Sequence, residues 1–263
     1  MGKKMKNNIP VVILCGGMGT RLREETEYKP KPMVEIGGQP ILWHIMKIYA
    51  HYGFTDFILC LGYKGSLIKE YFFSYEMIRN DCTVQLGQKN RITYQSNHKE
   101  QDFNITLVDT GLHTMTGGRI KRIEPYIKTD KFMVTYGDGL ADVNIKELIK
   151  FHNSHGKIAT LTATMPPSRF GILDLADKGR VKRFREKVET EWINGGFFVF
   201  DRKVFDYLDS DCILEKKPME KMAEDGELMA FPHQGFWIGM DTFREYELLN
   251  RMWDNGEAPW KIW

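Results

Sequence analysis

A glycine-rich segment with nearby cations carries the clearest chemical signal in the chain. Residues 16–22 read GGMGTRL and follow an apolar run, and residues 29–33 read KPKPM. Glycines let the backbone come close to phosphate oxygens and turn its N–H groups toward them, while Arg21 and Lys31 add positive charge. An ordinary strand-to-helix turn would account for the glycines but not for the cations. The two segments together therefore predict a site for a polyphosphate.

The glycine segment matches neither of two common phosphate-binding motifs. Its spacing differs from the GxGxxG of dinucleotide-binding proteins, and no Gly-Lys-Ser/Thr sequence closes it as in a Walker loop. The segment therefore predicts neither a dinucleotide cofactor nor a Walker-type ATPase.

Two aspartates have the setting of metal ligands. Asp138 stands between glycines after an apolar run, and Asp241 lies in the segment 239–242, GMDT. Mg²⁺ that serves a phosphate group is held by one or two carboxylates, phosphate oxygens and water. Asp138 and Asp241 are therefore candidate ligands of Mg²⁺. The alternative for each is a turn or cap aspartate, and Asp241 could simply start the last helix.

Strands and helices must bring these residues together. Apolar runs predict strands at 10–15, 57–61, 106–108, 132–136, 159–165, 171–175, 181–185 and 196–200. Helical spacing predicts helices at 40–52, 64–73, 117–127, 203–207, 217–225 and 243–253. Strands that alternate with helices are typical of an α/β fold with a mostly parallel, doubly wound sheet. Ligands of such sheets bind beyond the carboxyl ends of the strands.

Composition excludes several classes of protein. The 263 residues, 42% of them hydrophobic, are enough for one sizeable core. Lys plus Arg (37) nearly balance Asp plus Glu (35) without long runs of one sign, so we expect no nucleic-acid partner. No stretch approaches the roughly 20 apolar residues of a membrane span, and we expect no membrane association. Four cysteines without CxxC spacing predict structural thiols in the cytoplasm.

The segments GGMGTRL and KPKPM resemble the signature of sugar-1-phosphate nucleotidyltransferases. Other segments are similar to the glucose-1-phosphate cytidylyltransferase branch of that family, and the likeness covers nearly the whole chain. These segments are 35–45 (EIGGQPILWHI), 108–111 (VDTG), 116–119 (TGGR), 136–139 (YGDG), 159–164 (ATLTAT) and 258–261 (APWK). The resemblance implies a Rossmann-like three-layer α/β sandwich with a mostly parallel sheet and a smaller, mixed C-terminal region.

The resemblance also implies an activity and a domain organisation. The expected reaction joins CTP to α-D-glucose 1-phosphate in the presence of Mg²⁺ and yields CDP-glucose and pyrophosphate. We expect one domain over residues 1–263, with a nucleotide-binding core at 9–165 and a sugar-binding and oligomerisation region at 166–263. The resemblance also implies a homo-oligomer, with a hexamer as the candidate assembly.

Residue roles follow from the same resemblance. The residues expected to bind nucleotide are Gly16, Gly17, Gly19, Thr20, Arg21, Lys31, Thr110 and Gly111. The residues expected to bind the sugar phosphate are Glu186, Lys187, Asn194 and Gly195. Arg21, Lys31 and Lys187 are expected to act in catalysis, and Asp138 and Asp241 match the metal ligands of the family. Without the resemblance, residues 182–187 predict only a charged, solvated strand end.

Three departures from the family pattern concern the sugar. Val188 stands where the family usually has proline, the loop to Asn194 is about two residues shorter, and Leu214-Glu215 replaces a Trp-Glu pair. The class of reaction is unaffected by these changes. The identity of the sugar is open, and another hexose 1-phosphate or a different phosphorylated acceptor is the alternative.

Two other functions are alternatives to nucleotidyl transfer. A glycosyltransferase would hold Mg²⁺ through an Asp-x-Asp pair, which residues 138–140 lack. A non-catalytic regulatory paralogue has little use for Arg21, Lys31, Lys187 and both aspartates.

Several histidines and aromatic residues are interpreted as structural rather than functional. The histidines at 44, 51, 152 and 155 predict core or surface positions rather than zinc ligands. Residues 231–240 predict either a sugar pocket or apolar packing. Trp260 and Trp263 should pack on the body or on another subunit.

Overall fold

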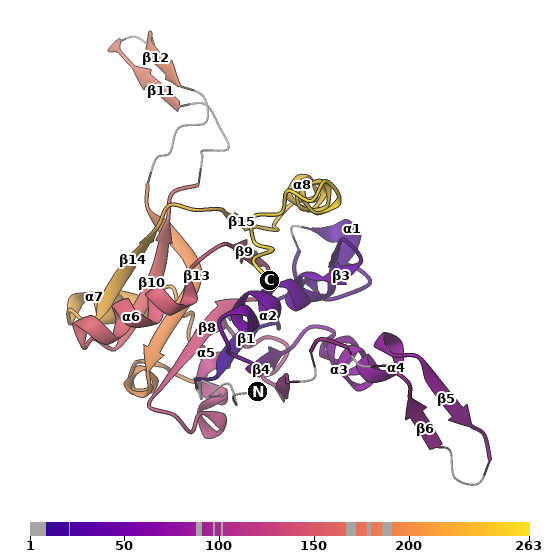
Figure 1. The fold of residues 1–263 in the computed structure, drawn as a ribbon. Helices are drawn as coiled ribbons and strands as arrows, with labels where there is room; N and C mark the ends of the chain where they lie inside the picture. The colour runs from indigo at the N-terminus through magenta and orange to yellow at the C-terminus, as the bar shows by residue number, and fades with distance from the viewer. Residues whose placement is uncertain are drawn as a thin grey trace.

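A seven-stranded sheet forms the centre of the computed structural model (Figure 1). The structure describes residues 9–20, 22–87, 91–96, 98–100, 102–166, 172–177, 180–185 and 191–263. In spatial order the strands are β14 (Leu228–His233), β10 (Ala159–Thr164), β13 (Ile193–Asp201), β8 (Lys131–Tyr136), β1 (Val11–Leu14), β4 (Asp56–Leu61) and β7 (Asn104–Asp109).

The sheet is mostly parallel. Strands β8, β1, β4 and β7 run in one direction, and β10 is parallel to β14. Only β13 is antiparallel to its two neighbours, β8 and β10. With helices on both faces, this arrangement confirms the predicted Rossmann-like α/β sandwich.

Alternating side chains of β1 serve the two faces of the sheet. Val11 and Ile13 belong to one core cluster and Val12 and Leu14 to the other, as the period of two in a strand requires. Helices α2 (Ile41–His51) and α6 (Ile145–His155) cover the first face. Helices α5 (Thr116–Arg122) and α7 (Lys217–Glu224), with the 3₁₀ helix η4 (Arg202–Tyr207), cover the second.

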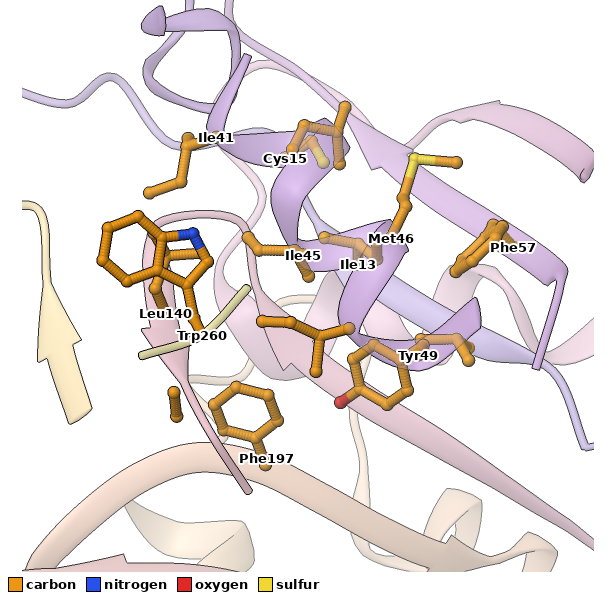
Figure 2. Packing of buried hydrophobic residues seen from close by; sticks show 14 of the residues in the cluster. Ile13, Cys15, Ile41, Ile45, Met46, Tyr49, Phe57, Leu140, Phe197 and Trp260 are labelled. Atoms are coloured by element: carbon orange, nitrogen blue, oxygen red, sulfur yellow. The ribbon is translucent and has the colours of Figure 1, made fainter. Parts of the chain in front are cut away.

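The C-terminal segment closes the first core. Figure 2 shows Trp260 beside Ile45 and Leu140, and Trp260 is fully buried. Its ring stacks on Phe236 with centroids 5.5 Å apart, and Trp263 contacts Trp43 at 5.7 Å. Of the two predicted alternatives, the body or another subunit, the structure shows packing of both tryptophans on the body.

His44 is a core residue held in its neutral form. Trp260 Nε1 donates to its Nδ1 at 3.3 Å, so the ring proton lies on Nε2, which donates to the Ile36 carbonyl at 2.9 Å. Burial lowers the pKa of His44 to about 4. His152 is also buried, with its pKa lowered to about 4 mainly by burial.

Two expected helices differ from the structure. The predicted helix 117–127 ends as α5 at Arg122 and continues as the 3₁₀ helix η2 (Glu124–Tyr126). Pro125 has no N–H and disfavours helical geometry in the residue before it, so the α-helix stops there. The predicted helix 203–207 is the 3₁₀ helix η4.

The remaining elements are short or peripheral. They are α1 (Arg23–Thr26), η1 (Lys31–Met33), β2 (Glu35–Ile36), β3 (Gln39–Pro40), α3 (Gly65–Phe73), α4 (Tyr75–Arg79), β9 (Gly139–Ala141), β15 (Trp237–Gly239) and α8 (Phe243–Asp254). Two hairpins, β5 (Cys82–Gln85) with β6 (Arg91–Tyr94) and β11 (Ile172–Leu175) with β12 (Val181–Arg185), project from the body (Figure 1). Among the described residues, no helix has the length and apolar character needed to span a membrane.

Candidate active site

A cavity of about 500 Å³ lies at the carboxyl ends of β1 and β8. Because β13 runs antiparallel, its amino end meets the carboxyl end of β8 and adds residues to the same cavity. The predicted residues that line it are Gly16, Gly17, Gly19, Thr20, Lys31, Asp138, Asn194, Gly195 and Asp241. The fold thus brings together residues that are more than 200 positions apart in the chain, as the 210-residue separation of Lys31 and Asp241 shows.

Lys31 lies between the two predicted metal ligands. Its Nζ is 2.6 Å from Oδ2 of Asp138 and 2.8 Å from Oδ1 of Asp241. Burial opposes the charge of Lys31, but the two carboxylates outweigh it and raise the pKa of the lysine. Lys31 is therefore an ammonium ion at neutral pH.

A short antiparallel pairing holds the two aspartates together. Asp138 precedes β9 and Asp241 follows β15, and these strands pair with Gly139 opposite Gly239. Met240 N also donates to the Asp138 carbonyl at 2.9 Å. Two carboxylates that converge on one cation are a suitable donor set for Mg²⁺. In the described part of the chain no cluster of three or more acidic, His or Cys side chains forms, so phosphate oxygens and water would complete the coordination shell.

Arg119 also lies at the cavity, although no role was predicted for it. Its side chain lines the cavity, yet the residue is only 4% exposed. The guanidinium donates to the carbonyls of Gly16, Leu61, Gly111 and Leu112 and to Thr110 Oγ1, at 2.8 to 3.3 Å. These bonds tie the chain at the carboxyl ends of β1, β4 and β7 together and so fix the start of the glycine loop (residues 16–20).

Thr110 and Gly111 do not line the cavity. Thr110 is fully buried, and its hydroxyl donates to the Leu61 carbonyl at 2.7 Å and accepts from Arg119. The Gly111 carbonyl accepts from the same guanidinium. The structure therefore places both residues behind the cavity, in contact with Arg119. Arg21, Glu186 and Lys187 lie outside the described residues.

The opposite side of the cavity is built from β8, β13 and β15. Trp237 Nε1 donates to the Gly195 carbonyl at 2.7 Å, and Asn194 Nδ2 donates to the Tyr136 hydroxyl at 3.1 Å. In segment 231–240, Phe236 packs on Trp260, as the packing interpretation predicts, whereas Trp237 lines the cavity. That this cavity binds the sugar stays a prediction.

The fold and the cavity define a class of protein: an α/β nucleotide-binding protein with a glycine loop, a buried lysine and two carboxylates at the carboxyl edge of its sheet. Residues 10–247 match the nucleotidyl transferase family, and the chain belongs to that family.

Relatives and solved structures agree with this membership. The chain is 54% identical to the glucose-1-phosphate cytidylyltransferase of Salmonella typhi, over 96% of this chain and 98% of that protein. It is 46% identical to the probable glucose-1-phosphate cytidylyltransferase of Bacillus subtilis, over 96% and 99%. The crystal structure of HddC from Yersinia pseudotuberculosis complexed with GMP-PN is similar, with a TM-score of 0.69, 25% identity and coverage of 93% and 99%.

Proposed function

We propose that this chain transfers the cytidylyl group of CTP to α-D-glucose 1-phosphate and forms CDP-glucose and pyrophosphate. The observation that carries the proposal is the 54% identity, over 96% of the chain, to a glucose-1-phosphate cytidylyltransferase. The cavity is consistent with it, because it combines a glycine loop, a cation and two carboxylates with a polar wall on the far side.

The proposed mechanism is a direct in-line displacement. An oxygen of the sugar phosphate attacks the α-phosphorus of CTP, and the bond to pyrophosphate breaks. A phosphate group is already ionised at neutral pH, so the chain needs no side-chain nucleophile or general base. Lys31 and Arg21 stabilise the charge that develops on the pyrophosphate, and Lys187 holds the attacking phosphate.

The two walls of the cavity divide the substrates between them. Gly16, Gly17, Gly19 and Thr20 face the nucleotide in this proposal, whereas Glu186, Asn194 and Gly195 bind the sugar phosphate. Asp138 and Asp241 would hold Mg²⁺, which when bound neutralises phosphate charge. Thr110 and Gly111 support the nucleotide side through Arg119.

The assembly and location of the protein are also proposals. Both projecting hairpins expose apolar side chains, among them Val84, Ile92 and Phe184, which supports a homo-oligomer and is compatible with a hexamer. Four free cysteines, two of them buried, support a reducing cytoplasm as the location.

A substrate panel tests the reaction. Pyrophosphate release is measured with Mg²⁺ for CTP, UTP, dTTP, GTP and ATP, each crossed with glucose, mannose, galactose and heptose 1-phosphates. We expect the highest kcat/KM for CTP with glucose 1-phosphate, because a site that hydrogen-bonds the cytosine amino group leaves polar groups unpaired with UTP. Turnover with CTP and another sugar 1-phosphate, but not with glucose 1-phosphate, would contradict only the assignment of the sugar. No pyrophosphate from any pair would favour a regulatory protein.

A further inference from the structure

A chain of hydrogen bonds runs from α5 to the side of the cavity that lies opposite the glycine loop. Thr116 Oγ1 donates to Glu215 Oε2 at 2.7 Å, and the Tyr136 hydroxyl donates to Glu215 Oε1. Asn194 Nδ2 in turn donates to the Tyr136 oxygen at 3.1 Å. Gly196 N donates to Asn194 Oδ1 at 2.9 Å. Tyr136 and Glu215 were assigned no role by the sequence.

The chemistry of these groups sets the direction of every bond. An ionised carboxylate only accepts hydrogen bonds, so the Tyr136 hydroxyl must give its proton to Glu215. Its oxygen can then only accept, and among the two ends of the Asn194 amide only the nitrogen can donate to it. The backbone N–H of Gly196 requires the amide oxygen at the other end. Both contacts thus fix the same orientation of the Asn194 amide.

Packing fixes the ring of Tyr136, since it meets Phe198 edge to face with centroids 5.7 Å apart. The hydroxyl is thereby held where it contacts both Glu215 and Asn194.

An amide nitrogen carries two hydrogens, and in the described part of the chain Asn194 Nδ2 uses one of them, toward Tyr136. Asn194 lines the cavity, so the second hydrogen can reach an oxygen of a bound ligand. We propose that Tyr136 and Glu215 are positioning residues that present Asn194 as a hydrogen-bond donor to an oxygen of the sugar phosphate. This inference rests on the proposed function and concerns its sugar half.

The first test is Tyr136→Phe, which removes the acceptor for Asn194 but keeps the ring. We expect KM for glucose 1-phosphate to rise about five- to tenfold, the effect of one hydrogen bond, with KM for CTP changed by less than about twofold. Tyr207→Phe is the matched control, because Tyr207 donates to Asp225 at 3.0 Å and does not line the cavity. Equal KM for glucose 1-phosphate in Tyr136→Phe and the parent protein would overturn the proposal.

A double-mutant cycle separates positioning from a general structural role. If Tyr136 acts through Asn194, Tyr136→Phe should add little to the KM of Asn194→Ala, whereas two independent effects would multiply. Glu215→Ala should resemble Tyr136→Phe, and Glu215→Gln should recover part of the loss because its carbonyl oxygen can still accept from Tyr136. Multiplying effects, or equal losses in Glu215→Ala and Glu215→Gln, would contradict the mechanism.

Calorimetric titration with glucose 1-phosphate keeps this test independent of turnover. A parent protein that binds the sugar phosphate but releases no pyrophosphate would contradict the proposed function alone. Weaker binding by Tyr136→Phe would still support the positioning role, and unchanged binding would reject it.

Discussion

Lys31 connects the two aspartates that the proposed reaction needs. Its ammonium contacts Asp138 and Asp241 at 2.6 and 2.8 Å, so three residues from distant segments share one ion-pair network. The lysine holds the two carboxylates close together, which is the arrangement in which they can accept a divalent cation. A bound metal ion would compete with Lys31 for the two carboxylates. The substrate phosphates would compete with the carboxylates for Lys31.

Replacement of either aspartate by asparagine should abolish most of the activity. Metal neutralisation of phosphate charge is worth several kcal/mol, so Asp138→Asn and Asp241→Asn should each lower kcat by roughly 100-fold or more at saturating Mg²⁺. The surface variant Asp225→Asn, which breaks an ion pair with Lys221 on α7, should leave kcat unchanged. Near-parental turnover in either aspartate variant would show that this residue is no metal ligand.

Neighbouring glycines of the loop should differ in their tolerance of a methyl group. A Cβ at Gly16 would lie 2.1 Å from Arg119 Nη1, whereas a Cβ at Gly17 meets nothing within 4 Å. Because overpacking costs about 1–3 kcal/mol, Gly16→Ala should lower the free energy of unfolding by that amount and Gly17→Ala should not. Urea unfolding of both variants measures the difference. Equal stability would mean that Arg119 is free to move aside.

Some site residues lie in short sequence motifs that indicate their chemistry, and others depend on contacts between distant segments. The glycine loop and Asp138 could be predicted to lie at the cavity because each follows a buried strand, and Lys31 because it lies in the KPKPM segment shortly after the loop. The roles of Arg119 and Glu215 depend on partners far along the chain, such as Leu61, 58 residues from Arg119, and Thr116, 99 residues from Glu215. Local patterns contain no information about such contacts.

At the level of elements, the start of α8 positions Asp241. Glu245 Oε2 accepts from the backbone N–H groups of Asp241 and Thr242 at 2.7 and 2.9 Å, and Thr242 caps the helix in a capping box. The cap therefore does more than satisfy the first turn of a helix. It also holds the backbone of a proposed metal ligand.

Two helix caps should have different effects on activity. Glu245→Ala and Asn144→Ala should each lower the free energy of unfolding by about 1 kcal/mol, because each removes a cap that accepts backbone N–H groups. Only Glu245→Ala should also raise the Mg²⁺ concentration needed for half-maximal turnover, since α6, which Asn144 caps, begins away from the cavity. A similar Mg²⁺ requirement in both variants would show that the cap of α8 does not position the proposed metal ligand.

The sequence predicted the type of an element, helix or strand, better than it predicted whether a helix is an α-helix or a 3₁₀ helix. The apolar runs that fill both faces of the sheet identified β1, β4 and β8 from the sequence. The stretch 117–127 kept its helical spacing of apolar residues, but Pro125 decided its geometry by removing one N–H. The remaining differences between the predicted and the observed elements depend on tertiary packing, which the periodicity of a sequence does not describe.

For the whole molecule, the buried histidines predict a dependence of stability on pH. The pKa of His44 is about 4 in the folded protein and near 6.5 when unfolded, so only the unfolded chain takes up a proton between these values. Stability is therefore full above pH 6.5 and falls as the pH decreases toward 4. The loss for one such histidine reaches about 1.4 kcal/mol at pH 5.5.

Urea unfolding at pH 7.5 and 5.5 measures this dependence. His44→Gln should have a smaller loss of stability between the two pH values than the parent protein. His51→Gln, on the exposed end of the same helix, should show the parental loss. Identical losses in the two variants would show that His44 does not contribute.

The position of β13 has a consequence for how the chain reaches its native state. This strand lies between β8 and β10 although it follows both in the sequence, and it joins them by ladders on each side. Until residue 201 has left the ribosome, β8 and β10 therefore have an open edge where β13 belongs. Open edges can pair with other chains, and long-range pairing is slow. The nascent protein should thus be most prone to aggregation, and most dependent on chaperones, shortly before β13 emerges.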